Sequence, residues 1–276
     1  MSSLRDRFAA LVRDGDRTDL GRAALEIARL AYPDLDAEAH LAELDTLGDG
    51  LRRRLGGGST TAAAAALADH LGGDAGFRGN VDDYYDPQNS FLNDVLRRRL
   101  GIPITLSVVF LEVGRRAGLA LEGVGFPGHF LVRLRGAPAP LLLDPFHGGK
   151  VVGLRELRAL LLAAHGGRPP ETIPSQFLEP TGTLDILARM LRNLLRIYVQ
   201  RKDHATALAA VDLVLVLLPD SPADLRARGL LYERLECFSA AREDFRRYLA
   251  LAPDAPDVAE MRARVSRLGQ MAPTLH

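Results

Sequence analysis

Two residues capable of proton-transfer chemistry stand at the ends of two neighbouring apolar runs. His129 opens the run 129–135, and Asp144 closes the run 140–144. A carboxylate that accepts a hydrogen bond from an imidazole fixes the ring and raises its basicity, which is the arrangement of a general base. The alternative is structural: the histidine only satisfies a strand, and Asp-Pro belongs to a turn. The catalytic interpretation requires the two runs to be strands of one hairpin.

The short turn between the runs determines which residues would face each other. We expect Arg135 to pair with Pro140 in an antiparallel hairpin. Leu131 then lies opposite Asp144. Because alternate residues of a strand point to the same face, His129 lies diagonally from Asp144, about 7 Å away between backbones and within reach of a side-chain hydrogen bond. A slip of one residue would put the two side chains on opposite faces.

A nucleophile for this pair is expected at the start of the helix predicted over 104–116, where free N–H groups and the helix dipole favour an anion. Pro103 suits the first turn of that helix but carries no nucleophile. The one cysteine, Cys237, lies far downstream. Thr105 and Ser107 offer hydroxyls. Thr105 is either a nucleophile activated by the histidine or a cap for a free N–H group, and we favour the cap because an alcohol ionises far less readily than a thiol.

A loop-like stretch precedes these elements. Residues 84–87, Tyr-Tyr-Asp-Pro, read as a loop, and a short helix is predicted to start near Asn89. We expect Tyr84, Tyr85 and Asn89, together with Pro103, to line a groove beside the histidine.

One spacing in the sequence could supply metal ligands. The spacing Asp144-x-x-His147 could supply two ligands, but no cysteine or third histidine stands at a ligand spacing from them. Gly148-Gly149-Lys150 lacks the upstream glycines of a phosphate loop and reads as a turn. We therefore expect no metal and no cofactor.

The C-terminal third repeats with a period of 34 residues, since Pro219 and Pro253 stand at that offset. This period is typical of tetratricopeptide (TPR) repeats. Other residues match at the same offset: Tyr198 with Tyr232, Ala207 with Ala241, and Val211 with Phe245. The pattern predicts two units at about 188–221 and 222–255. A helix over 258–271 should cap one end, because isolated repeats need a neighbour to cover their apolar face.

The pattern of Gly, Pro and apolar residues divides the chain. Residues 1–75 read as the N-terminal helical part of a core domain, and 76–180 read as the core itself. Gly166-Gly167-Arg168-Pro169-Pro170 is the expected start of a linker, so we place a boundary between 168 and 184. The repeats with their capping helix then occupy 184–276.

The composition excludes several classes of protein. The 35 basic and 35 acidic side chains cancel, so no electrostatic footprint for nucleic acid or for a membrane surface is present. The charged N-terminus shows no signal peptide, and no apolar run is long enough for a membrane span. A single cysteine suits a reducing compartment. We expect a cytoplasmic protein.

Five motifs carry a resemblance to a known family: 76–80, 84–92, 99–106, 127–132 and 144–149. Together with the repeats they resemble bacterial SirB-type transglutaminase-like proteins, which also carry TPR units at their C-terminus. The resemblance covers nearly the whole chain. It implies an α+β fold, with a transglutaminase-like (papain-like) core of helices on an antiparallel sheet and then an all-α TPR domain. His129 and Asp144 match the family, whereas Pro103 stands where transglutaminase-like enzymes have their cysteine.

Two functions follow from these observations. The missing cysteine and the repeats favour a non-catalytic module, a pseudoenzyme that binds a protein or peptide partner through the TPR face. The alternative is a hydrolase or acyltransferase, peptidase- or amidase-like, that uses Thr105, His129 and Asp144. The residue at the start of the 104–116 helix discriminates between them and favours the first.

Overall fold

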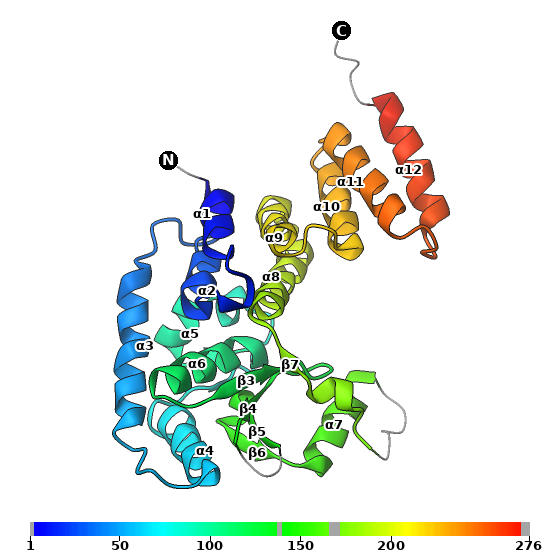
Figure 1. Cartoon of the computed structure of the whole chain (residues 1–276). Helices are drawn as coiled ribbons and strands as arrows, with labels where there is room; N and C mark the ends of the chain where they lie inside the picture. Colours follow the sequence, from blue (N-terminus) through cyan, green and yellow to red (C-terminus); the bar gives the residue numbers. More distant parts are fainter. Residues whose placement is uncertain (1–2, 137–139, 166–171, 272–276) are drawn as a thin grey trace. The chain divides into compact units, whose positions relative to one another are not determined.

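The computed structural model describes residues 3–136, 140–165 and 172–271. The chain divides into two compact units, which are described separately here and coloured by sequence in Figure 1. The core unit comprises residues 13–190, and the repeat unit comprises residues 1–12 and 191–276. Helix α8 (Thr183–Gln200) contributes its first part to the core unit and its second part to the repeat unit. In the described ranges, no helix is long and apolar enough to cross a membrane.

Three helices of the core unit begin at a short polar side chain. Besides the first part of α8, the α-helices of this unit are α2 (Leu20–Ala28), α3 (Ala37–Arg52), α4 (Thr60–Ala68), α5 (Leu92–Arg98), α6 (Pro103–Arg116) and α7 (Leu154–His165). The side chains of Asp19, Asp36 and Ser59 each accept a hydrogen bond from a backbone N–H in the first turn of α2, α3 and α4. These caps satisfy N–H groups that have no partner within the helix.

A five-stranded antiparallel sheet forms the other part of the core unit. Its strands are β3 (Leu121–Val124), β4 (Leu131–Leu134), β5 (Leu141–Asp144), β6 (Lys150–Val152) and β7 (Pro180–Thr181), in the order β6-β5-β4-β3-β7. A separate parallel pair is formed by β1 (Arg78–Gly79) and β2 (Leu100–Gly101). Leu131 and Val132 are both fully buried although they point to opposite faces, so the sheet is covered on both sides.

The register of the β4–β5 hairpin is the predicted one. Val132 pairs with Leu143, and Leu134 pairs with Leu141, which is the register that an Arg135–Pro140 pair would give. The predicted turn residues 137–139 lie outside the described residues, as do 166–171 of the predicted linker. The sequence had not predicted β6 and β7, because runs of three and two residues are too short to show alternation.

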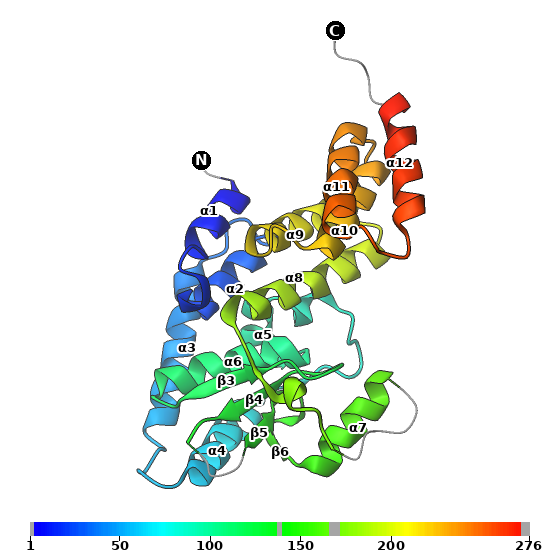
Figure 2. The same ribbon diagram turned by 45° about the vertical axis from the view of Figure 1, so that its right-hand side comes forward.

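Helix α6 is the centre of the core unit. Its residues from Pro103 to Gly114 are all buried, and it contacts α2, α3, α5, β3 and β4. Figures 1 and 2 both show α6 alongside β3, with α5 on its other side. Two glycines let α2 and α3 approach α6 closely: a Cβ on Gly21 would lie 2.7 Å from Glu112, and a Cβ on Gly48 would lie 2.5 Å from Arg116.

The repeat unit contains two helix pairs and a capping helix. Its elements are α1 (Leu4–Leu11), the second part of α8, α9 (His204–Leu217), α10 (Pro222–Arg234), α11 (Phe238–Leu251) and α12 (Val258–Met271). By residue range, α8–α9 and α10–α11 correspond to the two predicted TPR units. Within the unit, α10 contacts α9 and α11, and α12 contacts α11. Ala207 and Ala241 are fully buried. A Cβ on Gly229 would lie 2.6 Å from the Phe245 ring, so α10 and α11 cross closely.

An arginine also joins the helices of the repeat unit. Arg228 on α10 donates to Asp212 on α9 (Nη1 to Oδ1, 2.8 Å) and to both carboxylate oxygens of Asp244 on α11 (2.7 Å each). The two-pronged contact with Asp244 uses the planar fork of the guanidinium. The hydrogen bonds that Arg228 donates to Asp244 and then to Asp212 outweigh burial and raise the pKa of the guanidinium.

The units differ from the sequence-based domain limits at two places. Helix α1 groups with the repeat unit and contacts α9, although 1–75 were expected in the core domain. Residues up to 190 group with the core unit, because β7 adds to the sheet beside β3. Neither pairing can be read from local patterns, since both join segments far apart in the chain.

The close helix crossing gives a first prediction. Ala241→Leu should destabilise the protein by about 1–3 kcal/mol, because three added carbons have no space at a fully buried position. Thermal and urea unfolding measure the loss. The control is Ala250→Leu on the exposed side of the same helix, which should leave the unfolding midpoint nearly unchanged. Equal midpoints for both variants would mean that the repeat register is wrong.

Candidate functional site

His129 and Asp144 form a buried, hydrogen-bonded pair. His129 Nε2 and Asp144 Oδ1 are 2.8 Å apart, and the residues are 6% and 4% exposed. Strand β4 begins two residues after His129 and β5 ends at Asp144, so the observed register brings the two side chains together as predicted. The bond occupies Nε2, which leaves Nδ1 as the ring nitrogen that could exchange a proton with a ligand.

Asp144 also organises the 3₁₀ turn that follows β5, η4 (Pro145–His147). Its Oδ1 accepts a hydrogen bond from the Phe146 N–H (3.0 Å), and its Oδ2 lies 2.7 Å from His147 Nδ1. Its backbone carbonyl accepts from the Gly149 N–H. Burial raises the pKa of the carboxyl, but the hydrogen bonds from His129 and His147 outweigh burial and hold that pKa below its ordinary value.

Aromatic rings surround this pair. The Phe146 ring lies 6.0 Å from the His129 ring, and Tyr84 lies 6.1 Å from Phe146, both between centroids. Tyr85 packs edge-on against Tyr84 at 5.3 Å and is largely exposed. The predicted neighbours Tyr84 and Tyr85 thus reach the histidine through Phe146, which the sequence had not indicated.

Asn89 has a different place from the expected one. It is fully buried. Its Nδ2 donates to the Asp83 carbonyl (2.7 Å), and its Oδ1 accepts from Asn80 Nδ2 (3.0 Å). Because the amide is used to hold the loop 80–89 together, its expected role in lining a groove is corrected to a structural one.

The start of α6 offers no exposed nucleophile. Pro103 is buried in the first turn, and the helix has no side-chain cap. Thr105 is fully buried, and its Oγ1 makes no hydrogen bond to any residue that the structure describes. The expected cap is therefore corrected, and the hydroxyl makes no hydrogen bond with the His129 imidazole either. Ser107 Oγ donates to the Phe130 carbonyl (3.4 Å). Cys237 is exposed at the start of α11, in the repeat unit.

Arg189 on α8 is a site residue that no sequence motif indicates. Its Nη2 donates to the His129 carbonyl (2.7 Å), and its guanidinium lies 5.2 Å from the centroid of the Phe130 ring. Burial lowers the pKa of Arg189. The residue lies 60 positions beyond His129, on a helix that carries the first repeat, so no motif linked it to the pair. It fixes the backbone that presents the histidine.

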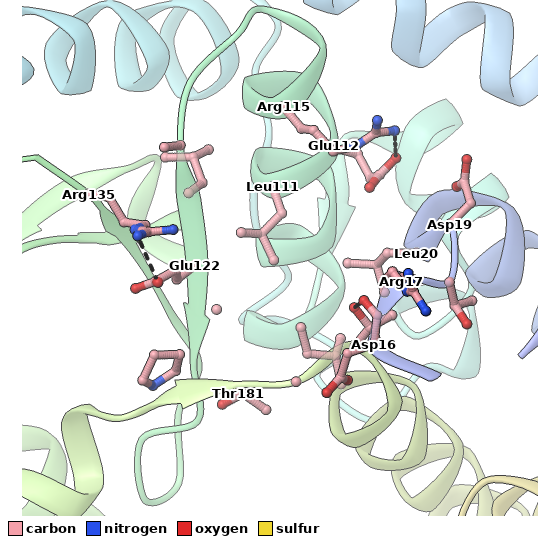
Figure 3. Close-up of a pocket in the computed structure, with 18 of the residues that line it drawn as sticks. Asp16, Arg17, Asp19, Leu20, Leu111, Glu112, Arg115, Glu122, Arg135 and Thr181 are labelled. Carbon is pink, nitrogen blue, oxygen red and sulfur yellow. Dashed lines mark hydrogen bonds and ion pairs between the residues drawn. The ribbon is translucent and has the colours of Figure 1, made fainter. Parts of the chain in front are cut away.

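A separate groove of about 1030 Å³ lies between α6, β3, β7 and the segment before α2 (Figure 3). Four of its charged groups pair within it: Glu112 with Arg115 (3.1 Å) and Glu122 with Arg135 (3.5 Å). Neither the histidine nor the aspartate of the buried pair lines this groove.

The carboxylate of Asp144 gives a prediction about pH. Because its folded-state pKa lies below the ordinary value of 3.8, its stabilising contribution is complete above that value and is lost as the pH falls through the lower folded-state pKa. Asp144→Asn should destabilise the protein by about 1.5–3 kcal/mol at neutral pH, since two histidines lose a charged acceptor. Urea unfolding from about pH 5 to about pH 2 should show a smaller loss of stability in Asp144→Asn than in the wild type. Asp82→Asn, at an exposed carboxylate, is the control and should follow the wild type. If the free energy of unfolding of Asp144→Asn fell with pH as steeply as that of the wild type, the prediction would be contradicted.

Comparisons with known proteins agree with this architecture. Residues 38–192 match the family described as the transglutaminase-like superfamily, and residues 194–266 match the tetratricopeptide repeat. A UPF0162 protein of Xylella fastidiosa (strain 9a5c) is 41% identical over 91% of this chain and 90% of its own. A UPF0162 protein of Vibrio cholerae is 32% identical over 73% of this chain and 74% of its own.

A eukaryotic relative shares only part of the sequence. Human F-box only protein 21 is 31% identical over 58% of this chain, which is 26% of the human protein. No solved structure matches the chain. The family matches and the bacterial relatives together lead to one conclusion: the chain belongs to the transglutaminase-like superfamily and, with its tetratricopeptide repeats, to the family of UPF0162 proteins.

Proposed function

We propose that this protein is a non-catalytic member of its superfamily that binds a protein or peptide partner through its TPR repeats. The observation that carries the proposal is the start of α6. There, a buried proline takes the position at which the enzymes carry cysteine, and the nearest hydroxyl, on Thr105, is buried without a hydrogen-bond partner among the described residues.

The chemistry of acyl transfer explains why the residues at the start of α6 favour a non-catalytic role. A general base needs an acidic group within hydrogen-bond reach, and a thiol ionises far more easily than an alcohol. His129 has its aspartate but lacks a hydroxyl or thiol partner among the residues described. In this proposal the pair has structural or ligand-binding work, for example donation from the imidazole to a peptide carbonyl.

The alternative function remains a hydrolase or acyltransferase that uses Thr105, His129 and Asp144. The intact hydrogen bond of His129 with Asp144 favours it, because that bond would orient an active imidazole. Thr105 would have to change its rotamer or its burial to reach the ring. We therefore rank this function second.

The repeats supply the second support. TPR repeats typically mediate protein–protein interaction, and the described part of the repeat unit exposes three large apolar side chains, Leu235, Leu251 and Met271. Apolar side chains on a polar surface are typical anchors for a partner helix or peptide. The proposal includes the SirB-type assignment that the sequence motifs indicated. It also includes a cytoplasmic location, since one cysteine suits a reducing compartment.

The catalytic part of the proposal predicts no turnover. Purified protein should neither incorporate an amine into a glutamine-containing protein nor hydrolyse peptides above the level of the Thr105→Ala and His129→Ala variants, because no activated nucleophile faces the imidazole. Turnover in the wild type that both substitutions abolish would establish a threonine-based enzyme and sink the proposal. Turnover that survives both substitutions would come from a contaminant.

If the partner binds through the repeats, substitutions in the repeat unit should reduce its capture and substitutions in the core unit should not. A pull-down from a lysate should capture a protein with the wild type and lose most of it with Leu235→Ser plus Leu251→Ser, because two exposed apolar side chains at the ends of the repeat helices α10 and α11 are replaced by polar ones. The matched control is Leu154→Ser plus Leu162→Ser, which removes two exposed leucines of the core unit. Equal capture by both double variants would contradict binding through the repeats.

A further inference from the structure

Within the described ranges, three side chains with metal-binding atoms converge at one place. They are His129, Asp144 and His147, and their donor atoms all lie within 4.8 Å of one another. His129 Nε2 is 2.8 Å from one carboxylate oxygen of Asp144, and His147 Nδ1 is 2.7 Å from the other. The sequence offered only the Asp144-x-x-His147 spacing. The hairpin register adds the third ligand from 15 residues upstream.

The backbone holds these three residues before any ligand binds. Gly148 and Gly149 both have positive φ, 69° and 84°, which turns the chain back directly after His147. The Gly149 N–H donates to the Asp144 carbonyl (2.8 Å). Gly148 packs so tightly on the neighbouring helical turn that a Cβ on Gly72 would lie 2.0 Å from its carbonyl oxygen. The turn is thus fixed from both sides, and little ordering would remain for a ligand to impose.

The donor set has a defined preference. Two imidazoles and one carboxylate suit Zn²⁺, Co²⁺, Ni²⁺ and Fe²⁺, whereas Ca²⁺ and Mg²⁺ prefer oxygen ligands. Tetrahedral ligands about 2.0–2.1 Å from a zinc ion lie about 3.3–3.4 Å apart, so the neighbouring donors, now 2.7–2.8 Å apart, would have to separate by roughly 0.6 Å when an ion binds. A dication would balance the charge of a carboxylate that is 4% exposed. The His147 side chain is 59% exposed, so an ion can enter from solvent.

We propose that His129, Asp144 and His147 form a binding site for a divalent transition-metal ion of the zinc or cobalt class. The remaining coordination positions face the exposed side of His147 and take water or a ligand group. The bound ion would occupy His129 Nε2 and release its hydrogen bond with Asp144. This proposal does not depend on partner binding by the repeats.

Two hydrogen bonds from the histidines to Asp144 would give the same distances without a metal. The test must therefore distinguish a metal site from this hydrogen-bonded arrangement. His147 separates them, because the His129–Asp144 pair does not need it whereas a three-ligand site does. The chain offers a matched control: His40 lies 3.9 Å from Glu43 at the same spacing of three residues, without a third ligand.

The experiment uses the full chain, stripped with a chelator and then titrated with Co²⁺ while the visible absorption of the ion is followed. Wild type and His40→Ala should bind one ion per chain, and Zn²⁺ should displace it. His147→Ala and Asp144→Asn should each lose at least about tenfold in affinity. His147→Ala removes a largely exposed side chain, and circular dichroism verifies that both variants are folded. No one-to-one binding by the wild type, or equal affinity in His147→Ala, would overturn the proposal. Neither result bears on the pull-down, which reports on different residues.

Discussion

Helix α6 has no exposed face from Pro103 to Gly114, and this fact constrains the whole core unit. A mostly apolar helix of this kind is stable in water only if other elements cover every side. Helices α2, α3 and α5 cover part of it and strands β3 and β4 cover another part. Gly21 and Gly48 let two of these helices approach, and the arginine and glutamate near the C-terminal end of α6 pair with each other there (Arg116 with Glu112). The site residues occupy positions that this packing determines.

The same constraint explains the state of the helix start. In an enzyme of this type the first turn has to be open to a substrate, whereas here Pro103 and Thr105 are buried with the rest of the helix. A hydroxyl without a partner in such surroundings costs stability and gains no reactivity, because an apolar environment disfavours its ionisation. The hydrogen-bonded pair of His129 and Asp144 lies in the same unit as this buried helix start, and the proposed binding role rests on that combination.

Features that neighbouring residues determine could be predicted from the sequence, whereas features that depend on contacts between distant segments could not. The β4–β5 hairpin could be predicted to the residue, because alternation and a short turn leave one register that buries the apolar residues. The repeats could be predicted because a period of 34 residues appears in the sequence itself. Asn89 and Thr105 were misplaced because their surroundings come from segments outside their own motifs. Arg189 and the convergence of His147 with His129 depend on tertiary contacts that no local pattern contains.

The contact of α1 with α9 has a consequence for synthesis of the chain. Helix α1 is made first, but its partner in the repeat unit is made roughly two hundred residues later, so closing that contact requires a long loop. Until α9 leaves the ribosome, the side of α1 that carries Phe8, fully buried in the finished protein, has no surface in its own unit to cover it. Contacts of such long range slow folding. The repeat unit thus completes its fold only after translation has passed α9, and the side of α1 that carries Phe8 stays uncovered by its unit during that interval.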